Sequence, residues 1–391
     1  MTTTKFSVQV AKHVIQGNIA KGKNMICSPA SIDAVLNMVA VGAVNKTQGQ
    51  LLTVLGHRDI PELKAVSSNL VNILKAPQTS FVNAMWLNQR YSFKPEFEKV
   101  MREVHNAHVR IVDFVNQRDQ VVKEANALAR QATKGLIKQI LRRDNIKDDT
   151  ALLLANGLYF KGTWLKPFKS RDTKSGSFNL LNGDNVRAPF MRHERKHFDY
   201  GTFNECQVIK MRYKSEISLD DNDDDDDVAL TKSFSMYVFL PFEKDGLPNV
   251  MENIKIDQNM FQDELKLDHV NVDLLLIPKF KFDSDVDVKN TMKQLGLTLP
   301  FDENCMDFSG ITDSIYPIYV SDIFQKCLIK TDELGTEAAA FTMTRHGFLG
   351  GSPPRSEIRF VADHPFMFVI REDVSGAILF VGTVLDPKSQ R

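Results

Sequence analysis

The apolar pattern of this chain changes along its length, from a mainly helical period early to short β-rich runs later. Ser28 can cap a helix, Pro29 suits its first position, and apolar residues then recur at helical spacing from Ile32 to Val39. Further helical patterns lie at 5–20, 47–55, 62–75, 95–105, 118–132 and 286–295. Apolar β-rich runs lie at 235–240, 272–277, 366–370 and 377–381. This separation of helices and strands predicts an α+β fold.

Composition and charge exclude several classes of protein. The length of 391 residues would allow two or three domains, but no repeat or Pro, Gly or Ser linker marks a boundary. Basic and acidic residues both number 49, so the net charge is zero and does not attract nucleic acid or an anionic membrane. No window approaches the roughly 18 uninterrupted apolar residues of a membrane span.

The N-terminus and the cysteines predict an intracellular protein. Polar residues such as Lys5 and Lys12 interrupt the N-terminal stretch, so it lacks the apolar core of a secretory signal. The four cysteines are far apart and form no CxxC pair, which favours free thiols in a reducing compartment. We expect a cytoplasmic or nucleocytoplasmic location, no cofactor and no structural zinc.

One low-complexity run breaks the globular pattern, because seven of the eight residues at 220–227 are aspartates. These charges repel one another and cannot pack in a core. Strand-like stretches flank the run, so we expect it at the tip of a β-hairpin as a solvated loop insertion. Weak Ca²⁺ attraction or a basic partner is the alternative, although the residues of an EF-hand loop are not in place.

Residues 193–197 match the HExxH pattern, in which two histidines one helical turn apart bind zinc and the glutamate is a general base. The pattern is short, and its His193, Glu194 and His197 stand among basic residues rather than on an apolar helix face. A zinc hydrolase is therefore the third-ranked hypothesis. Nucleophile-elbow, Walker and dinucleotide motifs are missing, so the sequence does not support an enzyme.

An irregular stretch at 342–356 carries glycines and prolines and lies between strand-like segments. Long structureless loops inside a compact chain are usually functional or disordered. Just before it, the Gly335-to-Ala340 segment has the composition of a short Ala-rich helix. It also fits a strand held in reserve, since small residues occupy one face by alternation and Gly335 could be a hinge. These small residues are Thr336, Ala338, Ala340 and Thr342.

Six motifs, in the same order along nearly the whole chain, resemble those of the serpin family, and of its intracellular plant type in particular. They lie at 24–32, 156–164, 277–281, 307–311, 335–340 and 360–366. The resemblance implies a single α+β domain over residues 1–391, with three β-sheets, about eight or nine helices and an exposed reactive-centre loop at about 335–357. In this frame the HExxH residues fall on sheet structure.

The resemblance also implies a protease inhibitor, not an enzyme, that acts as a suicide substrate. A target endopeptidase would cleave Leu349–Gly350, become trapped as an acyl-enzyme, and be carried away as the loop enters the main sheet. Leu349 suits chymotrypsin-like serine proteases, Phe348 suits papain-like cysteine proteases, and Arg345 could serve a trypsin-like enzyme. The hinge would comprise Gly335, Thr336, Glu337, Ala338, Ala339 and Ala340. We expect a monomer; the alternative is a non-inhibitory binding protein or protease substrate with the same fold.

Two further sets of residues follow from the resemblance. A gate at the top of the sheet would comprise Lys279, Glu333 and Trp164, and the middle of the sheet would be held by Ser28, Ser31, Asn156 and Gln325. Three positions depart from the family pattern. Gln325 stands where a histidine is usual, Leu334 replaces a charged residue, and Phe341 is bulky where a small residue is usual, which leaves the efficiency of loop insertion open.

Overall fold

The helical patterns of the sequence form the helices of the computed structural model, which describes residues 5–215, 232–256, 260–304, 307–336 and 357–389. The α-helices in these ranges are α1 (Lys5–Ile19), α2 (Pro29–Gly42), α3 (Asn45–Leu55), α4 (Ile60–Leu74), α5 (Pro95–Glu103), α6 (Arg118–Ala132), α7 (Leu247–Asn253) and α8 (Val288–Gln294). All seven predicted helices are confirmed, and the short α7 was not predicted. None of these helices is long and apolar enough to cross a membrane.

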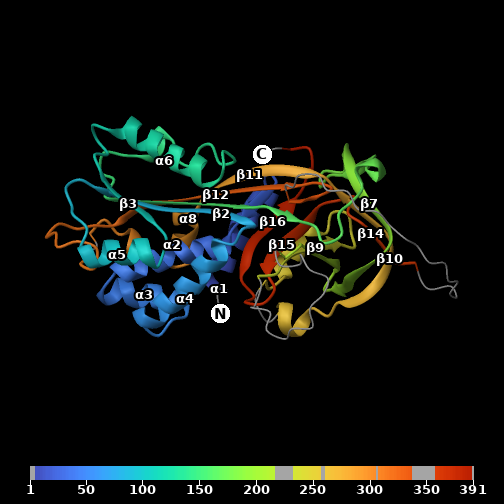
Figure 1. Ribbon diagram of the computed structural model, residues 1–391, viewed down its shortest axis with the longest axis horizontal. Helices are drawn as coiled ribbons and strands as arrows, with labels where there is room; N and C mark the ends of the chain where they lie inside the picture. Colours follow the sequence, from blue (N-terminus) through green and yellow to red (C-terminus); the bar gives the residue numbers. More distant parts are fainter. Residues whose placement is uncertain (1–4, 216–231, 257–259, 305–306, 337–356, 390–391) are drawn as a thin grey trace, which may run out of the picture.

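Helix α2 is central because it is buried on almost every side. Ser28 caps it as predicted, since its Oγ accepts a hydrogen bond from the Ser31 amide at 3.2 Å, and Pro29 occupies the first turn. Most of its apolar residues, including Val35 and Val39, belong to the largest hydrophobic cluster, and Ala30 and Ala34 belong to a second one. Figure 1 shows α2 on one side of a five-stranded sheet and α6 on the other.

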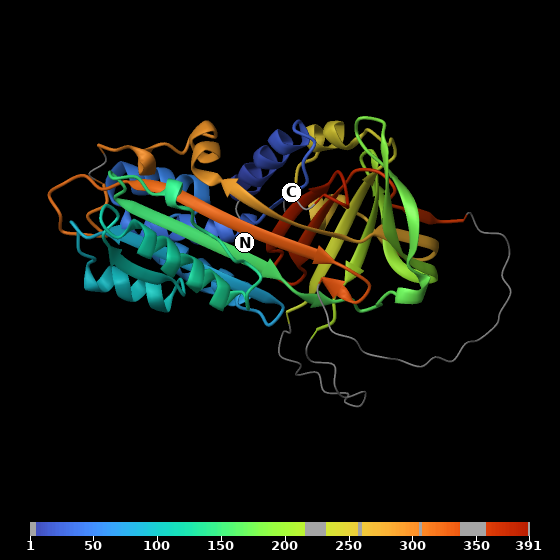
Figure 2. The same cartoon turned by 90° about the horizontal axis from the view of Figure 1, so that it is seen from above.

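The five-stranded sheet has the order β11-β12-β4-β2-β3. Its strands are β2 (Thr79–Asn88), β3 (His108–Val112), β4 (Leu152–Phe160), β11 (Phe280–Asp287) and β12 (Val320–Thr331). The neighbours β4 and β12 run parallel, with Asn156 opposite Gln325. Figure 2 shows these two strands as long arrows side by side. Three strands of this sheet, β2, β3 and β4, precede residue 161, so strands also occur in the early, mainly helical part of the chain.

A larger sheet of nine strands lies at the other end of the molecule (Figure 1). It comprises β1 (Met25–Cys27), β6 (Lys174–Asn179), β7 (Asn185–Phe203), β8 (Cys206–Arg212), β9 (Phe234–Pro241), β10 (Asp268–Pro278), β14 (Arg359–Val361), β15 (Phe366–Glu372) and β16 (Ile378–Val384). Strands β8 and β9 form the antiparallel pair expected on either side of the acidic run, and the run at 220–227 lies outside the described residues. A third, two-stranded sheet pairs β13 (Gly335–Thr336) with β5 (Gly162–Thr163).

Candidate functional site

The chain reverses direction directly after β12, through a tight turn that begins the predicted hinge. The Asp332 amide donates to the Gly335 carbonyl at 2.8 Å, and the Gly335 amide donates to the Asp332 carbonyl at 3.2 Å. Gly335 has a φ of +155°, and a Cβ there would lie 1.9 Å from the carbonyl oxygen of Gly162. Only glycine fits this close approach of the turn to β5.

Thr336, the residue after the hinge glycine, is fully buried against aromatic side chains. Its Oγ1 is 2.9 Å from the hydroxyl of Tyr213, whose ring stacks on Trp164 at 4.4 Å between centroids. The Trp164 indole Nε1 donates to the carbonyl of Asp332 at 3.0 Å, and the Trp164 amide donates to that of Leu334 at 2.9 Å. Trp164 therefore binds the turn through both its indole N–H and its backbone amide.

Lys279 and Glu333 form an ion pair at 2.7 Å on the same turn. The Glu333 carboxylate also accepts from the Thr173 hydroxyl at 2.8 Å, and its backbone carbonyl accepts from the Phe168 amide at 2.8 Å. Burial opposes ionisation of this carboxyl group, but hydrogen bonds from Lys279 and Thr173 outweigh it and lower the Glu333 pKa below its ordinary value. The three residues predicted for the gate thus meet at one turn, and their role as a gate stays a prediction.

In the middle of the sheet, Gln325 connects β12 to the start of α2. Its Oε1 accepts from the Ser28 amide at 3.1 Å, and its Nε2 donates to the Ser28 carbonyl at 2.9 Å and to the Ser31 hydroxyl at 2.7 Å. Ser28, Ser31 and Gln325 are all buried. The Gln325 side-chain amide both accepts and donates hydrogen bonds, so it connects β12 to α2 and stays uncharged.

Asn156 lies beside Gln325 but does not join this network. It sits between Gln325 and Asn83 in the register of β12, β4 and β2, so the three side chains point to the α2 face. Both polar atoms of the buried Asn156 side chain lack a hydrogen-bond partner among the described residues, as does Oδ1 of Asn83. Close by, burial, with a smaller effect of the Lys64 charge, lowers the pKa of His105 to about 4. Asn83 and His105 were not predicted from the sequence, although Asn83 is a polar residue inside an apolar run.

The remaining predicted site residues lie outside the described part of the chain. These are Glu337, Ala338, Ala339, Ala340, Phe341, Arg345, Phe348, Leu349 and Gly350. Leu334, which departs from the family pattern, lies in the tight turn, where its carbonyl accepts the bond from Trp164.

The structure contradicts the zinc hypothesis, because the HExxH residues lie on strand β7 and not on a helix. Residues four apart on a strand are about 13 Å apart and cannot share one zinc ion in the way that a helical turn allows. His193 stacks on Phe168 and its Nε2 is 3.0 Å from the carbonyl of Lys166, whereas His197 stacks on His269. No group of three or more His, Cys, Asp or Glu that could hold a metal occurs in the described ranges.

Comparison with known proteins identifies the class of protein that this fold defines. The family model described as Serpin (serine protease inhibitor) matches residues 1–387. Serpin-Z4 of Arabidopsis thaliana is 35% identical over 404 residues, which covers 98% of this chain and 97% of that protein. Serpin-ZX from the same plant is 34% identical and covers 97% of this chain and 96% of its own length.

The chain belongs to the serpin family, a family of protease inhibitors, and forms one serpin-fold domain. A structure described as Arabidopsis AtSerpin1 in its native stressed conformation superposes with a TM-score of 0.85 at 31% identity, covering 99% of this chain and 98% of that one. Serpin48 of the insect Tenebrio molitor superposes with a TM-score of 0.82 at 26% identity, covering 98% of each chain.

Proposed function

We propose that this protein inhibits a serine or cysteine endopeptidase as a suicide substrate, by inserting its cleaved loop between β4 and β12. One observation carries the proposal: the hinge turn stands at the end of β12, beside the parallel pair β4–β12. A chain that leaves β12 through this turn heads back along the sheet. It can therefore enter the β4–β12 junction as a strand antiparallel to both neighbours.

The sheet favours such an insertion energetically. Parallel pairs are slightly less stable per residue than antiparallel pairs, and insertion would replace one parallel pair with two antiparallel ones. The Asn156 side chain, buried without a partner among the described residues, lies on this junction and makes the closed sheet less stable than a fully satisfied one. The relative described as native stressed supports the same view of the closed form.

The length of the loop fits the trapping step. Attack by the serine or cysteine nucleophile on the Leu349 carbonyl carbon forms an ester or thioester and breaks the bond to Gly350, and the nucleophile's proton passes to the Gly350 amine. Thr336 to Leu349 comprises 14 residues, which span roughly 46 Å as a strand. The bound protease would be carried that far from its docking position, and its distorted active site could not hydrolyse the acyl bond.

The residues around the predicted scissile bond define the expected target proteases. Leu349 on the acyl side favours chymotrypsin-like serine proteases, and Phe348 favours papain-like cysteine proteases. Cleavage after Arg345 would leave four fewer residues to insert. We propose an intracellular setting, which the buried free thiols of Cys27, Cys206 and Cys327 support.

The test uses chymotrypsin and papain with a matched pair of hinge variants. By alternation Ala340 shares the face of Thr336 and would point into the core after insertion, whereas Ala339 would point outward. Thr336 is not substituted in this test, because it is already buried in the closed form and an arginine there would also disturb the uncleaved protein. We expect an SDS-resistant complex from the wild type and Ala339→Arg, and only cleaved inhibitor from Ala340→Arg. Clean cleavage of the wild type at Leu349 by both proteases, with no complex from either of them, would overturn the proposal.

A further inference from the structure

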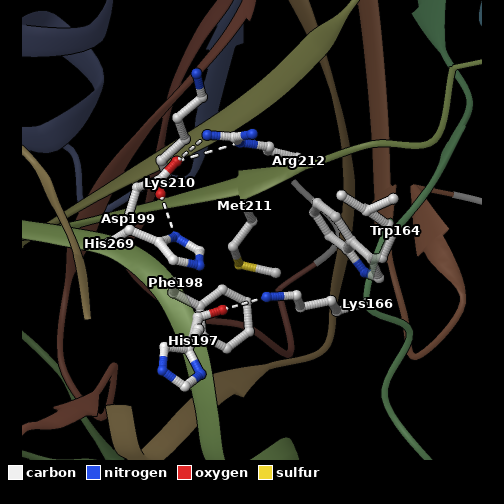
Figure 3. A pocket seen from close by; sticks show the side chains of 10 residues that line it. Trp164, Lys166, His197, Phe198, Asp199, Lys210, Met211, Arg212 and His269 are labelled. Carbon is white, nitrogen blue, oxygen red and sulfur yellow. Dashed lines mark hydrogen bonds and ion pairs between the residues drawn. The ribbon is translucent and has the colours of Figure 1, made fainter. Parts of the chain in front are cut away.

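A broad cleft lies between strand β7 and the segment 164–173, which connects β5 to β6. Its volume is about 490 Å³, within the range of small-molecule sites. The Lys166 side chain joins the two walls, because it donates to the carbonyl of His197 on β7 (Figure 3). His193 fixes the same segment, since its Nε2 is 3.0 Å from the Lys166 carbonyl and its ring stacks on Phe168. The two walls are therefore held together at one end of the cleft.

The cleft carries a surplus of positive charge, although the net charge of the whole chain is zero. Its basic lining residues are Lys166, Lys169, Lys174, Arg192 and Lys196. Its acidic lining residues are Asp172, which lies 3.9 Å from Arg171, and Glu194, which pairs with Arg192. Burial lowers the pKa of His193, so this residue adds no charge at neutral pH. Five basic and two acidic side chains thus leave a formal charge of +3.

The lysines carry this surplus. Lys166, Lys169 and Lys174 form no ion pair within the described part of the chain. Lys169 and Lys174 are exposed, so their side chains can turn toward a ligand. Burial lowers the pKa of Lys166, and the nearby charge of Lys196 lowers it further. An anion between the walls would relieve this repulsion and accept hydrogen bonds from the ammonium groups.

The chemistry of the walls favours phosphate groups. A lysine ammonium is a compact charge that binds phosphate, and each phosphate group brings about 1.5 to 2 negative charges and three acceptor oxygens. Two or three such groups would neutralise the cleft and reach lysines on both walls. The lining residues offer no open aromatic surface for a nucleobase, since the ring of His193 already stacks on Phe168. The cleft therefore suits the phosphates of a ligand and not a base.

We propose that this cleft binds a small, soluble polyphosphate, held between Lys166, Lys169 and Lys174 on one wall and Lys196 on β7. The site differs from the reactive loop, from the hinge turn and from the β4–β12 junction. Its ligand is a small molecule and not a protease. Nothing in the binding itself depends on loop cleavage.

One wall of the cleft also contacts the gate, which links binding to the proposed inhibition. The Phe168 amide donates to the Glu333 carbonyl at 2.8 Å, and the Thr173 hydroxyl donates to the Glu333 carboxylate at 2.8 Å. Both residues belong to the segment that the ligand would join to β7. This link rests on the proposed function: if loop insertion moves Glu333 away from Phe168 and Thr173, the ligand binds the closed form more tightly.

The binding test titrates sodium tripolyphosphate calorimetrically into the full-length protein. The double variant Lys169→Gln with Lys174→Gln removes two exposed charges of the cleft. The control, Lys99→Gln with Lys123→Gln, removes two exposed charges from α5 and α6, at the other end of the molecule (Figure 1). We expect saturable one-to-one binding, weakened at least about tenfold by the cleft variant and less than about twofold by the control.

Two further titrations test the chemistry of the site. Glu194→Gln removes the carboxylate that pairs with Arg192 and should tighten tripolyphosphate binding, whereas weaker binding would contradict the charge argument. ATP carries the same three phosphates and should bind no more tightly than tripolyphosphate. Tighter binding of ATP would overturn the assignment to phosphate groups alone.

The site itself is overturned by either of two results: no saturable binding of tripolyphosphate to the wild type, or an equal effect of the two double variants. The link to the gate is tested separately, with protein cleaved at Leu349. Weaker tripolyphosphate binding to the cleaved form supports the link, and equal binding to both forms overturns it. Failure of protease trapping would leave the calorimetric result on intact protein unchanged, so the two proposals fail independently.

Discussion

The gate and the middle of the five-stranded sheet are both buried and polar, but they differ in how well their polar groups are satisfied. At the gate, the Glu333 carboxylate has both Lys279 and Thr173 as partners, and Trp164 holds the turn by its indole and its amide. In the middle, Gln325 is fully used, whereas its neighbour Asn156 has no partner among the described residues. The closed sheet is thus held firmly at its end and poorly satisfied at its centre, where a new strand would enter.

The largest expected effect on stability comes from cleavage of the loop at Leu349, which frees the chain after β12 and changes no side chain. If the freed segment enters the β4–β12 junction, cleavage should raise the melting temperature by at least about 10 °C. For a chain of this size, that shift corresponds to several kcal/mol in the free energy of unfolding. Differential scanning calorimetry of cut and uncut protein measures it, with inactivated protease as the control. An unchanged melting temperature would favour the non-inhibitory alternative.

The next largest effect should come from Gln325→Leu. This change leaves the Ser28 amide, the Ser28 carbonyl and the Ser31 hydroxyl without their buried partner, and unsatisfied buried groups are costly. We expect the free energy of unfolding to fall by about 2–4 kcal/mol in urea titrations. Gln131→Leu, at an exposed position of α6, is the control. Equal effects of the two variants would show that Gln325 does not hold β12 to α2.

At the gate, Glu333→Gln should lower the free energy of unfolding by about 1–2 kcal/mol, because the Lys279 ammonium loses its charged partner in a site that is only partly exposed. The exposed Glu243→Gln is the matched control. The variant should also insert its cleaved loop faster, which can be followed by Trp fluorescence. A variant as stable as the control would mean that the backbone bonds of the turn, and not the ion pair, close the gate.

The Glu333 contribution should also depend on pH in a defined direction. Its folded pKa is lowered, so the stabilisation is fully present above the unfolded carboxyl value of about 4.3 and is lost as the pH falls through the lower folded pKa. The wild type and Glu333→Gln should therefore differ in unfolding free energy at pH 7 and converge in strong acid. A gap that stays constant down to the acid limit would assign the effect to packing instead of charge.

The sequence predicted the helices and strands that have a clear apolar period, and it predicted contacts between residues of the family motifs. It did not predict contacts that depend on how distant strands pair. Seven helices and the β8–β9 hairpin followed from apolar spacing. Strand β2 was missed because its buried run, from Thr79 to Asn88, lacks the alternation of a half-buried strand. Asn83 and Asn156 become neighbours only through the pairing of β2 with β4, which no local pattern specifies.

The smallest expected effect, at Asn156, is the sharpest test of the contrast between the two regions. Replacing an unsatisfied buried amide by an apolar group of similar shape is close to neutral, so Asn156→Leu should change the free energy of unfolding by less than about 1 kcal/mol. Asn156→Ala is the control, because it leaves a cavity and should cost more. A loss above about 2 kcal/mol for the leucine variant would mean that Asn156 is hydrogen-bonded in solution through buried water. The centre of the sheet would then be as well satisfied as its gate, and the driving force for insertion would have to come from strand pairing alone.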